Sequence, residues 1–378
     1  MKRASLLIMG LGDLGGYALE FLAREPRMPR IVTADINEDW GIRKTNSAIA
    51  GASQMNLYPE IEFIPLDVFD IDKTANILQE IEPTVIYNSM SLQSWWVITR
   101  LPEKAYKAID EARYGPWFPM HFVPAYKLMQ AVKKSGVKAK VVNAAFPDLV
   151  NPVLAKRGLS PVVGIGNVDN IATMMRIVAA KLFEVPLRAV TVYVVCHHFL
   201  SYYASRFGNS AGSPYYLKIM VDDKDMTDKI DPNELFTHLT GIGRRPGSTH
   251  AHPVVAASVC RIVKGILFDT KELAHAPGPN GLLGGYPIRL SAEGADVHLP
   301  QDLTLEKAIE INKRGQVYDG IESIEEDGTV VITDKSADLF KKFLDFDCKR
   351  YRVEECEQKY HELDEKFKKW GAELTTAD

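Results

Sequence analysis

The feature that most constrains the fold is a glycine-rich loop between a short apolar run and a helical pattern. Residues 4–9 read ASLLIM, which predicts a buried strand, and the following GLGDLGG contains Gly10, Gly12 and Gly15. The next stretch, YALEFLAREP, has apolar residues at helical spacing. A second apolar run ends in Asp35, which lies 20 residues after Gly15. A strand, a glycine turn, a helix and an acid at this distance are together typical of a dinucleotide-binding unit.

This loop predicts NAD as a cofactor. Glycines let the backbone approach a pyrophosphate at a helix N-terminus, where free N–H groups favour negative charge. The Asp35 carboxylate can accept hydrogen bonds from ribose hydroxyls and would repel the extra phosphate of NADP. Arg43 and Lys44 lie downstream and leave NADP open. The candidate cofactor-binding residues are Gly10, Gly12, Asp13, Leu14, Gly15, Asp35, Ile36, Asn88, Ser89, Met90 and Asn143.

Strands alternate with helices through the first 150 residues, which predicts an α/β fold with a Rossmann-type, doubly wound parallel sheet. After that point the pattern changes to long helices and strand–turn–strand segments, which predicts an α+β domain. We therefore expect an NAD-binding domain over 1–150 and a catalytic domain with a helical tail over 151–378. Further strands are expected at 31–36, 61–67, 84–90 and 140–145, helices at 169–183 and 253–268, and a loop at 201–216.

Composition limits the possible partners. The 378 residues are 46% apolar and carry a net charge of −4, so no basic surface for nucleic acid is expected. No run reaches the roughly 20 apolar residues that a membrane span needs. The four cysteines show no CxxC spacing, which favours reduced thiols in the cytoplasm. We expect a cytoplasmic protein that acts on a small molecule.

A carboxylate and a histidine stand at the two ends of a predicted helix–strand pair. Asp169 opens the helix, and His198, 29 residues later, ends the strand that begins AVTVYVV. If the strand runs back along the helix, the two side chains meet. A carboxylate would then fix the tautomer of the imidazole and stabilise its protonated form, as proton transfer to or from an alcohol oxygen requires. The neighbouring His197 is expected on the opposite face of the strand.

These residues resemble the lactate/malate dehydrogenase superfamily. NVD at 167–169 and CHH at 196–198 are similar to its acid and histidine elements, and VVNAAFPDLVNPVLAKRG is similar to the segment that precedes them. The likeness extends over about residues 5–345. It implies an NAD-dependent dehydrogenase in which His198 is the acid/base catalyst and Asp169 its orienting carboxylate, assembled as a homodimer or homotetramer.

The expected substrate differs from that of the family. In the family, an arginine three residues after the acid binds the carboxylate of the substrate. Ala172 stands at that position here, so the residue that would hold the carboxylate of a 2-hydroxy acid is missing. The segment at 91–122, in the place of the family's mobile loop, is rich in aromatic residues. We therefore expect a bulky or aromatic secondary alcohol or ketone. The candidate substrate-binding residues are Trp95, Trp96, Arg100, Arg113, Trp117, Ala172, Tyr202 and Thr249.

Two other functions stay open. His250 and His252, together with Cys196, His197 and His198, are ligand types for a metal, as in an NAD- and metal-dependent glycosidase of the same superfamily. The primary expectation is that no metal is used. A non-catalytic NAD-binding regulator is the other alternative.

Overall fold

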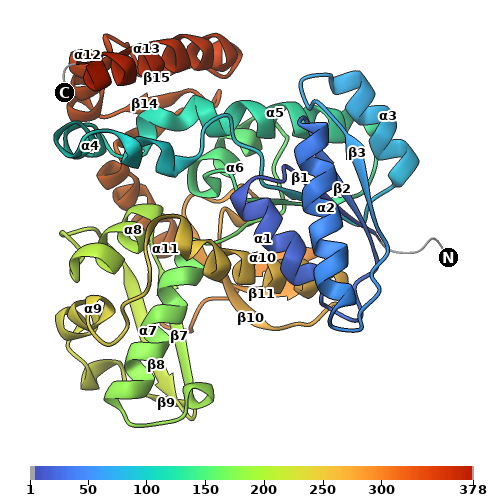
Figure 1. The fold of residues 1–378 in the computed structure, drawn as a ribbon. Helices are drawn as coiled ribbons and strands as arrows, with labels where there is room; N and C mark the ends of the chain where they lie inside the picture. Colours follow the sequence, from blue (N-terminus) through green and yellow to red (C-terminus); the bar gives the residue numbers. More distant parts are fainter. Residues whose placement is uncertain (1–4, 377–378) are drawn as a thin grey trace.

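A parallel sheet of six strands forms the centre of the N-terminal half in the computed structural model, which describes residues 5–376 (Figure 1). The order β3-β2-β1-β4-β5-β6 reverses direction at β1, as in doubly wound sheets. All five strand pairs are parallel, so the predicted Rossmann-type sheet is confirmed. The strands are β1 (Ser5–Met9), β2 (Arg30–Asp35), β3 (Ile61–Pro65), β4 (Val85–Asn88), β5 (Lys140–Asn143) and β6 (Val163–Gly164).

Helices cover both faces of this sheet, so its central strands β1 and β4 are buried on both sides. Along β1, Leu6 and Ile8 belong to one hydrophobic core and Leu7 and Met9 to another, as the alternation of side chains in a strand requires. The first core is closed by α1 (Asp13–Leu22), α2 (Glu38–Ser53) and α10 (His252–Leu267). The second is closed by α3 (Ile71–Ile81), α5 (Phe118–Ser135) and α6 (Pro147–Lys156).

The middle of the chain forms two antiparallel sheets. One is covered by α7 (Val168–Leu182), α8 (His198–Phe207) and α9 (Pro232–Thr240) and contains β7 (Val190–Val195), β8 (Tyr216–Val221) and β9 (Lys224–Asp225). The other contains β10 (Leu273–Pro277), β11 (Gly285–Ser291) and β12 (Gly294–Val297), and α11 (Leu305–Gln316) follows it. This α+β part agrees with the predicted fold class.

The C-terminal residues form a third small sheet and two helices, of which the last packs on α5 (Figure 1). Trp117 lies at this contact, with its ring centroid 5.0 Å from Phe340 and 5.2 Å from Phe367. The expected helical tail therefore buries one face on the body of the protein. Its elements are β13 (Ile321–Ile324), β14 (Val330–Ile332), α12 (Asp334–Leu344), β15 (Arg350–Tyr351) and α13 (Cys356–Thr376), and α4 (Glu103–Asp110) lies nearby.

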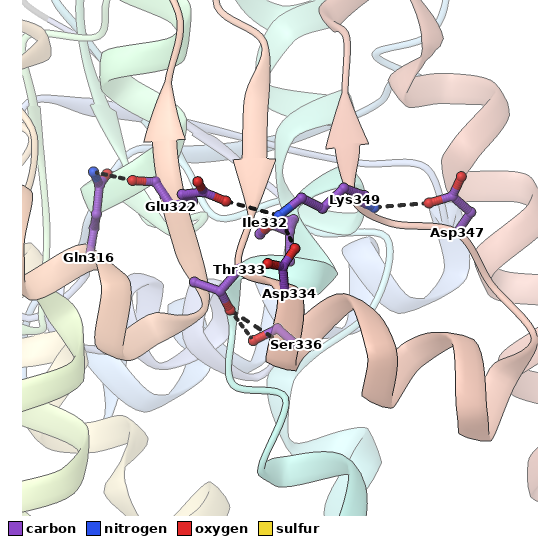
Figure 2. A network of polar contacts seen from close by, with 8 residues as sticks. All are labelled: Gln316, Glu322, Ile332, Thr333, Asp334, Ser336, Asp347 and Lys349. Atoms are coloured by element: carbon purple, nitrogen blue, oxygen red, sulfur yellow. Dashed lines mark hydrogen bonds and ion pairs between the residues drawn. The ribbon is translucent and has the colours of Figure 1, made fainter.

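A lysine joins the three strands of this small sheet (Figure 2). The Lys349 amine lies 2.9 Å from the Glu322 carboxylate and 2.7 Å from the Asp334 carboxylate, and it donates to the Ile332 carbonyl at 2.7 Å. These partners lie on β13, at the start of α12 and on β14. One side chain thus bonds to two strands and one helix of the C-terminal part.

The predicted end of one strand and the loop after it need correction. The strand that precedes the histidines ends at Val195, and His198 begins α8, so part of the loop predicted over 201–216 is helical. The sheet also gains β6, beyond the boundary expected at residue 150, although the division into domains stays a prediction. Within residues 5–376, no helix is both long and apolar enough to cross a membrane.

Candidate active site

A cavity of about 560 Å³ extends from the glycine loop over the sheet to α8. It lies at the carboxyl ends of the parallel strands, where doubly wound sheets bind ligands. Asn88 and Asn143 do not line it, because their side chains bond to each other at 2.9 Å and Asn143 also bonds to Asn151. The predicted cofactor-binding residues that do line it are Gly10, Gly12, Asp13, Leu14, Gly15, Asp35, Ile36, Ser89 and Met90.

The glycine loop is shaped for a close approach of backbone to ligand. A Cβ atom at Gly15 would lie 2.0 Å from the Gly10 carbonyl oxygen and 2.5 Å from the Ser89 hydroxyl, so no larger residue fits there. A Cβ at Gly12 would meet nothing within 4 Å. Gly12 is also the N-cap of α1 and supplies no side-chain cap, which leaves the first-turn N–H groups for a phosphate.

Asp35 ends β2 beside this loop. Its carboxylate accepts a hydrogen bond of 2.6 Å from the Leu11 N–H and lines the cavity. Of the two cations that left NADP open, Arg43 pairs with Asp39 at 2.8 Å and Lys44 lies over an indole ring of its own helix. The local charge around the expected ribose is therefore that of the Asp35 carboxylate, which suits NAD.

Two histidines share one buried carboxylate at the other end of the cavity. The Nδ1 atoms of His197 and His198 lie 2.9 and 3.0 Å from the same oxygen, Oδ2 of Asp319. The Nε2 atom of His197 is fully buried and has no partner within the described part of the chain, whereas His198 lines the cavity. Because a carboxylate only accepts hydrogen bonds, each Nδ1 carries a hydrogen. Nε2 is therefore the nitrogen of His198 that is left to exchange a proton with a ligand.

The charges of this cluster reinforce each other. Burial lowers the pKa of His198, but the charge of Asp319 and the hydrogen bond to it outweigh burial, so the pKa lies above its ordinary value of 6.5. Burial raises the pKa of the Asp319 carboxyl, but the charge of His198 and bonds from both imidazoles hold it well below its usual range. Asp319 thus stays ionised and favours the imidazolium form of His198.

The predicted pairing of Asp169 with His198 is not found. Asp169 is buried at the start of α7, where it accepts a hydrogen bond of 3.2 Å from Arg261. Burial raises the pKa of Asp169 against the charge of Arg261. The prediction needed His198 at the end of a strand that runs back along α7, but β7 ends at Val195. Asp319 takes the orienting position instead, and 121 residues separate it from His198 with no motif to signal the contact.

A second buried carboxyl lies near the histidines. Asp148, in the first turn of α6, bonds through one oxygen to the Asn167 side chain, and its other oxygen has no partner among residues 5–376. Burial raises its pKa, and the charges of His197 and His198 partly offset this. Asp148 therefore adds negative charge near His198 only in its ionised form.

Aromatic rings surround the imidazole of His198. Ring centroids of Tyr114, Phe146 and Tyr202 lie 5.0, 5.3 and 6.2 Å from it. The Tyr202 hydroxyl donates to Asp110 at 2.7 Å, so this tyrosine presents its ring to the cavity. Tyr202 was predicted as a substrate-binding residue, whereas Tyr114 and Phe146 were not. Tyr114 belongs to the aromatic-rich segment 91–122, and Phe146 belongs to the segment VVNAAFPDLVNPVLAKRG that carries part of the family resemblance.

The predicted tryptophans divide between cavity and core. Trp95 and Trp96, in the 3-10 helix Trp95–Arg100, line the cavity. Trp117 does not line it and is 4% exposed in the core under the C-terminal helices, so its predicted substrate role is not supported. Arg100 stacks on Trp96 at 4.2 Å and also lies outside the cavity lining.

The remaining predicted substrate residues are absent from the cavity lining. Arg113 lies 3.8 Å from the Asp110 carboxylate, and Ala172 is 4% exposed within the core of α7. Thr249 lies in the 3-10 helix Ser248–Ala251, of which Ala251 reaches the cavity. The side chain of Ala172 is therefore part of the hydrophobic core and does not face the cavity.

The candidate metal ligands do not form a cluster. Within residues 5–376, no three His, Cys, Asp or Glu side chains come together in a group that could hold a metal ion. His252 lines the cavity, and burial lowers its pKa.

Comparison with known proteins identifies the fold. No protein-family model and no curated protein matches the sequence. Among solved structures, the chain is similar to lactate dehydrogenase from Cryptosporidium parvum, complexed with lactic acid and nicotinamide adenine dinucleotide, with a TM-score of 0.57, 16% identity and coverage of 84% of this chain and 99% of that one. It is also similar to malate dehydrogenases from Plasmodium falciparum (TM-score 0.59, 15% identity, 89% and 100% covered) and Picrophilus torridus (TM-score 0.57, 16% identity, 90% and 99% covered).

The chain thus has the fold of lactate and malate dehydrogenases over nearly the full length of those proteins. The likeness predicted from the sequence is confirmed at the level of the fold.

Proposed function

We propose that this protein is an NAD-dependent oxidoreductase that interconverts a secondary alcohol and a ketone. The observation that carries the proposal is the His198–Asp319 pair, whose imidazole lines the same cavity as the glycine loop while the buried carboxylate lies behind it. The dehydrogenase fold and the NAD complexes of proteins that share it support the same reading.

The residues of the loop fit NAD. The close contact at Gly15, the open N-terminus of α1 and the carboxylate of Asp35 match the needs of a pyrophosphate and an adenosine ribose. When bound, NAD supplies the hydride acceptor in alcohol oxidation.

The proton step belongs to His198. In alcohol oxidation its neutral Nε2 accepts the hydroxyl proton, and in ketone reduction the imidazolium returns it. Asp319 holds Nδ1–H and stabilises the positive ring, which keeps Nε2 directed toward the reacting oxygen.

We propose a bulky, partly aromatic substrate. Trp95, Trp96, Tyr114, Phe146 and Tyr202 line the cavity, and this favours flat apolar groups. The burial of Ala172 removes the position from which an arginine would clamp a carboxylate beside the carbinol.

The test measures NAD binding and NAD reduction separately. NAD affinity is determined by titration calorimetry, and turnover is followed as NADH formation with a panel of secondary alcohols that differ in size and in the presence of a carboxylate. We expect the His198→Gln variant to bind NAD as the native protein does and to lose about 100-fold or more in turnover. Equal turnover in the variant would remove His198 from the reaction, and NAD binding without turnover on any alcohol would favour the regulator.

We also propose a cytoplasmic homodimer or homotetramer. The four cysteines are free thiols, which suits a reducing compartment. Light scattering of the purified protein tests the subunit count.

A further inference from the structure

His121 faces the same cavity as His198. It lies in the first turn of α5, is 6% exposed and lines the cavity. Its ring stacks on Tyr114 at 5.2 Å and lies 6.3 Å from Phe146. Because the same two aromatic rings contact His198, both imidazoles belong to one small region of the cavity.

The hydrogen bonds around Ser91 fix the tautomer of His121. The Ser91 hydroxyl lies 2.5 Å from the Gln93 carbonyl, which can only accept, so the hydroxyl donates its one proton there. The same Ser91 oxygen lies 3.1 Å from Nδ1 of His121 and must therefore accept from it. Burial, together with the charge of His198, lowers the pKa of His121 to about 3. His121 is thus neutral, with its hydrogen on Nδ1 and a lone pair on Nε2.

This Nε2 atom is an acceptor with no donor. Within residues 5–376 no side chain or backbone group bonds to it. Nε2 of His197 is fully buried and also lacks a partner, whereas Nε2 of His121 is not fully buried. The small exposed surface of His121 therefore includes Nε2. An acceptor that stays unpaired when a ligand excludes water costs stability of the complex, so the ligand is expected to bring a donor.

We propose that Nε2 of His121 accepts a hydrogen bond from a second hydroxyl of the substrate, so that the enzyme acts on a diol rather than on a simple alcohol. The inference rests on the proposed function and adds the class of substrate to it. A carboxylate at this place is disfavoured, because its oxygens would face the lone pair of Nε2.

Two substitutions separate the two nitrogens of His121. In His121→Asn the side-chain amide reaches the Nδ1 position and can still donate to Ser91, but the acceptor at Nε2 is gone. In His121→Gln the amide oxygen reaches the Nε2 position, and the bond to Ser91 is lost. Each variant is the matched control for the other, and thermal unfolding checks that both are folded.

The experiment compares 1-phenyl-1,2-ethanediol with 1-phenyl-1-propanol, in which a methyl group replaces the second hydroxyl, by NAD reduction with the native protein and both variants. We expect the native protein to prefer the diol, His121→Asn to lose about threefold to tenfold in kcat/KM for the diol only, and His121→Gln to keep most of the preference. A preference lost in His121→Gln and kept in His121→Asn would mean that His121 only supports Ser91, and equal use of both alcohols by the native protein would likewise overturn the inference. In those two cases the proposed oxidoreductase stands, whereas bound NAD with no turnover of any secondary alcohol would refute the function and the inference with it.

Discussion

Asp319→Asn removes the charge that holds His198 and keeps the size of the side chain. Both imidazoles donate to the same Oδ2 atom, but only His198 reaches the cavity, so one charged hydrogen bond acts on the reacting group. Such a bond contributes about 1.5–3 kcal/mol. Since 1.36 kcal/mol corresponds to a factor of ten in rate, we expect kcat/KM for alcohol oxidation to fall by roughly 10- to 150-fold.

The pH dependence of the same variant gives a second readout. Alcohol oxidation needs the neutral imidazole, so in the native protein kcat/KM rises with pH through a pKa above 6.5. Without Asp319, burial and the charge of Arg206 lower the pKa of His198, and only Asp148 opposes them. The midpoint of the kcat/KM profile for oxidation should therefore move to lower pH. Ketone reduction needs the imidazolium, so its activity should be lost as the pH rises through the same lower midpoint.

The assay follows NADH formation across pH with saturating NAD and limiting alcohol. Asp169→Asn is the matched control, because this carboxylate bonds to Arg261 rather than to His198. The control is expected to lower the free energy of unfolding and to leave the midpoint in place. A midpoint that moves in Asp169→Asn and stays in Asp319→Asn would refute the assignment of Asp319 and restore the pairing expected from the sequence.

Three further changes test other parts of the structure. Gly15→Ala places a methyl group 2.0 Å from the Gly10 carbonyl oxygen, so the loop must shift, and calorimetry should show NAD affinity reduced by roughly 10- to 100-fold. Ala172→Arg puts a charge into the core of α7, and denaturant unfolding should show a loss of about 3–5 kcal/mol with no gain of activity on lactate. Lys349→Met removes two partly exposed ion pairs and should lower the free energy of unfolding by about 1 kcal/mol in thermal and denaturant unfolding. The control is Lys341→Met, which removes a solvent-exposed ion pair with Asp345.

Local sequence patterns predicted the sheet and the cofactor end of the site because both depend on neighbouring residues. The strand Ser5–Met9, the glycine turn and the acid at Asp35 follow each other within 35 residues, and burial on both faces makes β1 a continuous apolar run. The fold then brings Asp35 to Leu11 without help from distant segments. The same applies to the hairpin of β11 and β12 and to the helix α10.

The reacting end of the site depends on contacts between distant segments, and the prediction of its carboxylate failed there. His198 was found because it follows a predicted helix–strand pair opened by an acid, in a pattern that resembles a known family, but its partner Asp319 lies 121 residues away and no motif marks it. Asp169 had the expected place in the sequence, and Arg261, 92 residues later, binds it instead. The tryptophans were equally ambiguous, since Trp95 and Trp117 belong to the same aromatic-rich segment and only packing separates core from cavity.

The turn that carries Asp319 is fixed from its C-terminal side. Gly320 has a φ of +81°, and a Cβ there would lie 2.5 Å from the Ser336 hydroxyl, so only glycine allows the chain to turn against α12. The Thr333 N–H donates to the Gly320 carbonyl at 2.9 Å, which ties the turn to the end of β14. Because the small C-terminal sheet holds these groups in place, it positions the Asp319 carboxylate beside His198, and we infer that the C-terminal elements support the proposed proton transfer.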